Sequence, residues 1–274
     1  MRENDIKQAP AQAAAAQGGR RDFFKQAAAG MGGAAMILAF GREGAVWLAG
    51  RPAKAQEVPV ESGYDITRHD YLYLIDINKC IGCGSCVRAC KAENDVPPLH
   101  FRTWVERYLV SRTGETYIDS PHGGLESFPP VDTGMDITKA FFVPKLCNHC
   151  THTPCVQLCP VGASYRTRDG VVLVDEKRCI GCGYCVQACP YGSRFIHPVT
   201  HTATKCTLCY HRITKGLLPM CVQACPTGTR MFGDRKRPGD PVVEMVATMQ
   251  VRRLKPELLT EPNCYYLGMG QEVR

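Results

Sequence analysis

The stretch from Cys179 to Pro190 reads CIGCGYCVQACP and holds four cysteines within eleven residues, followed directly by proline. An earlier stretch, from Cys80 to Cys90, reads CIGCGSCVRAC and is identical to it at nine of eleven positions. So close a match in both residues and sulfur spacing indicates an internal repeat. The fold therefore depends on what these repeated cysteines hold.

Two further stretches carry the same sulfur order with a longer gap before the third cysteine. CNHCTHTPCVQLCP begins at Cys147, and CTLCYHRITKGLLPMCVQACP begins at Cys206. All four stretches end in Cys-Val-x-x-Cys; proline follows in three of them, and Lys91 follows the first. We call them the first to fourth quartets in chain order, with the cysteines Cys80, Cys83, Cys86, Cys90; Cys147, Cys150, Cys155, Cys159; Cys179, Cys182, Cys185, Cys189; and Cys206, Cys209, Cys221, Cys225.

This spacing is typical of 4Fe-4S ligation in bacterial ferredoxins, where the fourth cysteine of a run binds the other cluster of a pair. The last two sulfurs of each quartet lie at i and i+4, so a helix presents them on one face, one turn apart. Glycines in the first and third loops are expected to adopt positive φ and to turn N–H groups toward sulfur, which tunes the reduction potential. These glycines are Gly82, Gly84, Gly181 and Gly183.

Zinc and disulfides are the competing explanations for seventeen cysteines in 274 residues. Zinc sites normally join two well-separated Cys-x-x-Cys pairs rather than four cysteines in eleven residues. Cysteines two residues apart rarely bridge outside redox motifs. The pattern therefore favours iron-sulfur clusters, with Cys264 left outside the ligand set.

Over nearly all of residues 69–270, the sequence resembles the iron-sulfur electron-transfer subunit (the B subunit) of the dimethyl sulfoxide reductase superfamily of molybdopterin oxidoreductases. The resemblance includes the unequal gaps before the third cysteine and the tail LKPELLTEPNCYYLG. In that family the outer quartets pair and the inner quartets pair, which implies four 4Fe-4S clusters. Their implied ligands are Cys80, Cys83, Cys86 and Cys225; Cys206, Cys209, Cys221 and Cys90; Cys147, Cys150, Cys155 and Cys189; and Cys179, Cys182, Cys185 and Cys159.

The expected fold is α+β, with two bacterial dicluster ferredoxin-like units built from crossed halves. Short β-branched or aromatic runs precede the quartets, as in YLYLIDINK and VVLVDEKR, and more weakly in AFFVPKL and THTATK, so each module reads as strand, cluster loop and short helix. The expected segments are 69–99 (first half of the outer unit), 100–139 (a β-rich insertion), 140–199 (the inner unit), 200–230 (second half of the outer unit) and 231–274 (a C-terminal extension).

The insertion and the extension carry their own secondary-structure signals. TWVERYLVSRTGETYI reads as a hairpin about a glycine-containing turn, which either covers the clusters or docks a partner. VVEMVATMQVRR reads as an amphipathic helix, and we expect the extension to dock against a neighbouring subunit.

Residues 1–55 are typical of a twin-arginine export signal: Arg20 and Arg21 precede a weakly apolar run to Gly41 and the small-residue site Ala53-Lys54-Ala55. A basic pair before an ordinary Ala-rich helix and a retained anchor are the alternatives. No later segment approaches eighteen apolar residues. The expectation is a periplasmic protein, exported folded because cluster binding and folding are coupled, which meets the membrane only through a partner.

Charged residues do not indicate nucleic-acid binding. Eight basic and four acidic residues of the formal +7 lie in residues 1–55, and each oxidised cluster with its thiolates adds about −2. Lys79, Lys145, Arg178 and Lys205 lie beside cluster cysteines, where they either raise local potentials or are simply solvated. His149 and His152 are expected to form hydrogen bonds around the second quartet rather than to bind metal.

Clusters with four cysteine ligands leave no open site for substrate, and no catalytic signature stands out, so no catalytic residue is expected. The sequence predicts an electron relay. By resemblance its partners are a molybdopterin-type catalytic subunit and a quinone-interacting integral membrane subunit. A free-standing periplasmic polyferredoxin shuttle and the relay subunit of a periplasmic hydrogenase remain open, as does the direction of electron flow.

Overall fold

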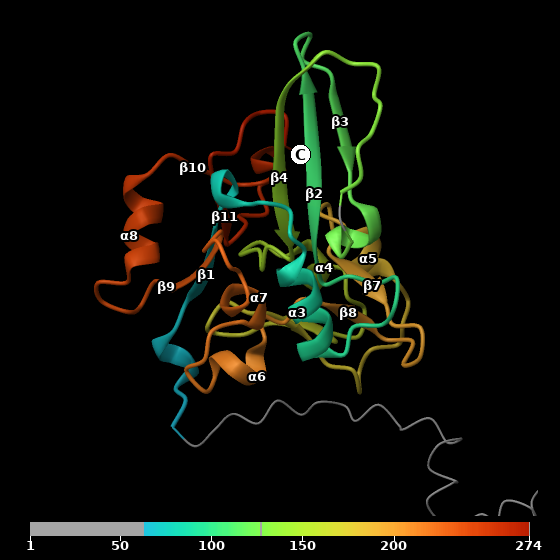
Figure 1. Cartoon of the computed structure of the whole chain (residues 1–274). Helices are drawn as coiled ribbons and strands as arrows, with labels where there is room; N and C mark the ends of the chain where they lie inside the picture. The colour runs from blue at the N-terminus through green and yellow to red at the C-terminus, as the bar shows by residue number, and fades with distance from the viewer. Residues whose placement is uncertain (1–62, 127, 274) are drawn as a thin grey trace, which may run out of the picture. The chain divides into compact units, whose positions relative to one another are not determined.

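The computed structural model of the chain describes residues 63–126 and 128–273 (Figure 1). The predicted export signal, residues 1–55, lies outside the described residues. Short helices and strands alternate along the described part, and the strands form one four-stranded, one three-stranded and two two-stranded sheets. The α+β class predicted from the sequence is confirmed.

The central strand is β1 (Tyr71–Asp76), whose six residues are all buried. Its odd-numbered side chains enter the main core, while Leu72 and Leu74 pack on the opposite face beneath α8 (Pro241–Thr248). A strand covered on both faces is continuously apolar or aromatic rather than alternating, which explains the run YLYLI. The sheet order is β10 (Val251–Arg252), β11 (Cys264–Leu267), β1 and β9 (Arg230–Asp234).

The halves of the two units cross as predicted. In the outer unit, α3 (Ser85–Asn94) of the first quartet packs on α7 (Met220–Gln223) of the fourth, and β1 runs antiparallel to β9. In the inner unit, α4 (Pro154–Gln157) packs on α5 (Tyr184–Gln187). The strands between those helices, β5 (Ser164–Arg166) and β6 (Val172–Val174), form an antiparallel pair.

A strand precedes every quartet, and a helix carries the third cysteine of each. Besides β1 and β6, the leading strands are β4 (Ile137–Leu146) and β8 (Ala203–Lys205), the latter paired with β7 (Arg194–Ile196). The longer gap before the third cysteine of the fourth quartet forms an additional helix, α6 (Tyr210–Ile213). Helices α4, α5 and α7 each end two residues before the cysteine of a Cys-Pro pair. Proline disfavours helical backbone at the residue that precedes it. In the first quartet Lys91 stands in place of the proline, and α3 continues past Cys90 to Asn94, with a total length of ten residues.

The predicted hairpin is present as β2 (Thr103–Ser111) and β3 (Thr116–Asp119), with Gly114 at positive φ in the turn. β4 pairs with the other edge of β2, so the insertion and the inner unit share one three-stranded sheet. The hairpin end of this sheet projects away from the helices of the quartets (Figure 1). Buried side chains at its base, among them Val105, Tyr108 and Val143, join the main core.

Much of the C-terminal extension belongs to the chain's own core. β11 lies parallel to β1, with Tyr73 opposite Cys264, and α8 covers the outer face of that sheet. Four single turns of 3-10 helix complete the described part: η1 (Ile66–Arg68), η2 (Ile77–Lys79), η3 (Pro121–Gly124) and η4 (Pro256–Leu258). None of the described helices has the length and apolar character needed to span a membrane.

Candidate iron-sulfur centres

The four cysteine loops share one backbone conformation. The residue before the second cysteine has φ of 69° at Gly82, 69° at Gly181, 44° at His149 and 56° at Leu208. Positive φ is also found at Gly84 and Gly183, so the prediction for the four glycines is confirmed. His149 and Leu208 adopt a conformation that non-glycine residues rarely take, which indicates that the loop geometry is imposed in all four repeats.

One predicted ligand set lines a single cavity. Cys90 from α3, Cys206 and Cys209 from the fourth loop, and Cys221 from α7 all border it. The side-chain amide of Asn94 donates to the sulfurs of Cys90, at 3.7 Å, and Cys209, at 3.6 Å. The structure therefore brings together four thiols from opposite ends of the described chain, the same four that the resemblance implies for one cluster.

The other outer set is linked by the electrostatic effects of its thiols on one another. Burial, together with the neighbouring Cys86 and Cys225, raises the pKa of Cys80 to about 11. Burial likewise raises the pKa of Cys86, with contributions from Cys225 and Cys83. The packing of α3 on α7, which ends shortly before Cys225, brings the fourth thiol toward the three of the first loop.

One inner set shows the same grouping, and two thiols of the other set pack together. Burial, together with Cys147, Cys155 and Cys189, raises the pKa of Cys150 to about 12. Cys185 lies with Cys155 in a small apolar cluster, against which Cys179 packs. The remaining two thiols of that set are Cys159, which is half-buried, and Cys182, which is exposed.

Backbone N–H groups point at several sulfurs. Ser164 donates to Cys159 at 3.4 Å, Ala203 to Cys179 at 3.3 Å and Leu208 to Cys206 at 3.4 Å. Burial alone would raise the pKa of Cys159, but N–H groups of the residues that follow lower it overall. The pKa of Cys225 is lowered in the same way. These donors favour the thiolate, which is the form that binds iron.

All seventeen cysteines are free of disulfides. In the part of the chain that the structure describes, no three His, Cys, Asp or Glu side chains are grouped to hold a single metal ion. Exposure differs among the predicted ligand sets: two sets contain an exposed thiol, Cys83 or Cys182, whereas Cys90, Cys206, Cys209 and Cys221 of a third set are all buried.

The four cations next to the quartets behave differently. Lys79 and Arg178 have side chains that are 50% and 70% exposed. Their exposure favours the prediction that they are simply solvated. Lys145 is buried, but it pairs with Glu106 at 2.7 Å. Lys205 is buried, donates to the carbonyl of Cys206 and lies near Cys147 of the inner unit. Among these four, Lys205 is therefore the buried cation that faces thiols.

The two histidines of the second quartet bond to backbone. The Nδ1 atom of His149 accepts the N–H of Val172 at 2.9 Å. Burial, together with Lys205 and Arg194, lowers the pKa of His149 well below its usual value, so the ring is neutral. His152 is exposed, and its Nδ1 lies 3.2 Å from the carbonyl of Leu259. In these contacts both rings brace the loop against neighbouring backbone.

Sequence reasoning missed the residues that surround the thiols. Arg194 and Arg230 are buried cations with unpartnered nitrogens that face cysteines. An uncompensated buried charge is costly, so an anionic group bound to the thiolates fits this environment. The sequence feature that could have identified them is an arginine five residues after the last cysteine of both the third and the fourth quartet. The signal for Asn94 was its position one helical turn after Cys90.

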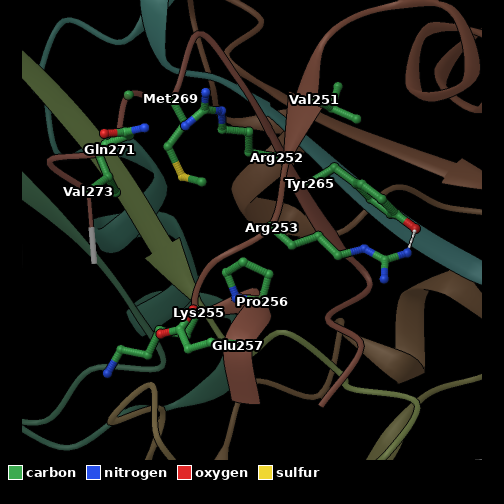
Figure 2. A pocket seen from close by; sticks show the side chains of 11 residues that line it. Val251, Arg252, Arg253, Lys255, Pro256, Glu257, Tyr265, Met269, Gln271 and Val273 are labelled. Carbon is green, nitrogen blue, oxygen red and sulfur yellow. Dashed lines mark hydrogen bonds between the residues drawn. The ribbon is translucent and has the colours of Figure 1, made fainter. Parts of the chain in front are cut away.

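A pocket of about 740 Å³ lies at the C-terminal extension (Figure 2). It is lined by residues of β10, η4 and β11 and of the segment 269–273, none of them a cysteine. Two of its three cations donate hydrogen bonds. Arg253 donates to the hydroxyl of Tyr265, and Lys255 donates to the carbonyl of Pro190 at 2.7 Å. The second bond ties the extension to the end of the third quartet.

Two family models, both described as 4Fe-4S dicluster domains, match residues 79–163 and 138–235. The fold and the thiol sets thus define a protein with two 4Fe-4S dicluster ferredoxin-like domains. The chain is 45% identical over 204 residues to the tetrathionate reductase B subunit of Salmonella typhimurium, covering 74% of each chain.

Two other relatives give the same result. The protein of the same name from Archaeoglobus fulgidus is 46% identical over 199 residues, which is 73% of this chain and 82% of the relative. The selenate reductase B subunit of Mesobacillus selenatarsenatis is 36% identical over 230 residues, 72% and 71% of the two chains. The chain belongs to the family of iron-sulfur B subunits of tetrathionate, selenate and dimethyl sulfoxide reductases. The resemblance described above is confirmed.

The close approach at the third loop is testable by substitution. A Cβ added at Gly181 would lie 2.2 Å from the carbonyl oxygen of His201, whereas one at Gly183 would meet nothing within 4 Å. Both residues have positive φ, so alanine at either costs about 1–2 kcal/mol of conformational strain. Gly183→Ala should lower the melting temperature by roughly 2–4 °C per kcal/mol. Gly181→Ala should lower it further and reduce iron content; equal effects of the two would contradict the contact.

Proposed function

We propose that the chain relays electrons through four 4Fe-4S clusters between a quinone-handling membrane subunit and a molybdopterin catalytic subunit of a periplasmic respiratory oxidoreductase. The family supports an iron-sulfur subunit of a reductase. The thiol grouping supports four clusters, with the sixteen ligands assigned as the sequence resemblance implies. When bound, each cluster supplies transfer of one electron at a time.

The observation that carries this proposal is the continuity of the thiol sets. Cys86 of one outer set interacts electrostatically with Cys221 of the other. Cys206 of that second set is influenced by Cys147 of the inner unit, and Cys155 shares an apolar cluster with Cys185. In quartet numbers the order in space is first, fourth, second, third. Such a series supports a path for electrons through all four proposed clusters.

The two ends of this series are the exposed ones. Cys83 belongs to the first set and Cys182 to the last, whereas the set containing Cys206 is wholly buried. The chain thus shields the middle of the series from water and opens both ends to partners. Large apolar side chains lie exposed next to the end cysteines: Ile81 at 61%, Ile180 at 65% and Tyr184 at 57%. These are the residues that a docked partner would cover, which favours a stable complex over a free shuttle.

Single cysteine substitutions test the cluster assignment. Cys225→Ser and Cys90→Ser should each remove or weaken one cluster, which lowers the iron content by up to about four of about sixteen atoms. Cys264→Ser is the matched control, because this thiol is buried outside every predicted set. Iron and zinc are measured on anaerobically purified protein. Abundant zinc with little iron in the unaltered chain, or loss of iron in the control alone, would contradict the assignment.

Crosslinking from the two ends tests the partners. A photoreactive residue at Ile81 and another at Ile180 should capture two different proteins in gently solubilised membranes, identified by mass spectrometry as a molybdopterin-type subunit and a multi-span membrane subunit. A third position, the exposed Leu217, serves as the control for non-specific capture. Recovery of the chain alone in the soluble fraction would favour the shuttle. Capture of a nickel-iron catalytic subunit would favour the hydrogenase relay.

Export through the twin-arginine route is part of the same proposal and rests on the sequence of residues 1–55 alone. Arg20→Lys combined with Arg21→Lys should leave loaded precursor in the cytoplasm. The measurement is fractionation with immunodetection and iron analysis, and a single Arg2→Lys change is the control for loss of an ordinary basic residue. Normal periplasmic arrival of the double variant would overturn the export assignment.

A further inference from the structure

Two arginines occupy equivalent positions in the two dicluster units. Arg194 lies five residues after Cys189 and begins β7, and Arg230 lies five residues after Cys225 and begins β9. The corresponding positions after the first and second quartets are Asp95 and Ser164. Each unit therefore contains one arginine at this position, contributed by the half that comes later in the chain.

Both arginines are buried and only partly satisfied. Arg194 is 4% exposed and donates through Nη1 to the hydroxyl of Ser164 at 2.8 Å. Arg230 is 2% exposed and donates through Nη2 to the hydroxyl of Thr103 at 2.6 Å. In each, Nε and one further nitrogen have no hydrogen-bond partner. Neither guanidinium forms an ion pair with a carboxylate within the described residues, so an anion other than a carboxylate must neutralise its charge.

The anions that face each guanidinium are thiolates from both sets of its unit. Arg230 acts electrostatically on Cys80 and Cys86 of one predicted set. It also acts on Cys90 of the other set, and Cys221 of that set acts on it in turn. Arg194 interacts electrostatically with Cys155 and Cys147 of one inner set and with Cys185 of the other. The hydrogen bonds agree with this placement. Thr103, which accepts from Arg230, lines the cavity bordered by Cys90, Cys206, Cys209 and Cys221. Ser164, which accepts from Arg194, donates its own N–H to Cys159. Each arginine is thus placed to act on both sets of its unit.

We propose that Arg194 and Arg230 are each the shared counter-cation of both clusters in one dicluster unit and raise the two reduction potentials of that unit together. This rests on the four-cluster relay proposed above. Reduction adds a negative charge to a cluster, and a buried cation stabilises that charge strongly because the surroundings screen it little. Guanidinium suits the role because it stays charged when buried and presents several donors in a fixed plane.

The test is redox titration of each cluster, followed by electron paramagnetic resonance, in the full-length, cluster-loaded protein. Arg230→Gln should lower two of the four potentials by at least tenfold in the reduction equilibrium, about 59 mV for one electron. Arg194→Gln should lower the other two. The control is Arg178→Gln, which removes a cation directly next to Cys179 whose side chain is 70% exposed; it should leave all four potentials within a few-fold of the unaltered protein.

The outcomes separate this inference from the function on which it rests. Unaltered protein that holds far fewer than about sixteen irons overturns the four-cluster function itself. If the protein is fully loaded, three results overturn this inference but not the four-cluster function. They are a shift of only one potential, a shift of the same two potentials in both variants, and no shift at all. If a glutamine variant fails to load, Arg→Lys at that position decides: recovery of the pair with near-normal potentials supports the shared charge, and failure to recover counts against it.

Discussion

Placing sixteen predicted ligand sulfurs in one small body, nine of them buried, creates a charge problem on which the rest of the structure depends. Burial raises the pKa of Cys90 to about 12 and that of Cys206 well above its usual value. The chain offsets this with donors and cations placed at the sulfurs: backbone N–H groups, the amide of Asn94, and the buried cations Arg194, Lys205 and Arg230. Without such groups, thiolates at these positions would be strongly disfavoured.

The crossed connection follows from how little apolar surface each quartet carries by itself. α4, α5 and α7 are each four residues long, so a single strand-loop-helix module cannot enclose its cysteines. Packing α3 on α7 and α4 on α5 encloses them from two sides. The outer unit also needs a sheet, which β1 forms with strands contributed by the last part of the chain. Cluster ligation and core packing are thus achieved by the same contacts.

Local pattern was sufficient to predict the strands before the quartets, the short helices, the hairpin and the positive φ of the loop glycines. The crossing of halves came from resemblance, since spacing alone does not say which repeats pair. β11 was not predicted as a strand, because its pairing with β1 is set by residues far away in sequence. The arginines were overlooked because a charged side chain is ordinarily read as exposed, and its burial depends on anions that no linear pattern displays.

The pairing of β1 with β9 and β11 also determines the order in which the molecule can be completed. During synthesis, N-terminal segments usually fold first. Here the inner unit is contiguous, and its strands β5 and β6 are neighbours in sequence. The first quartet, by contrast, is enclosed only when α7, β9 and β11 from the last part of the chain pack against α3 and β1. The earliest cysteines to leave the ribosome are therefore among the last to be enclosed, and through that interval the nascent chain carries open thiols that must be kept reduced.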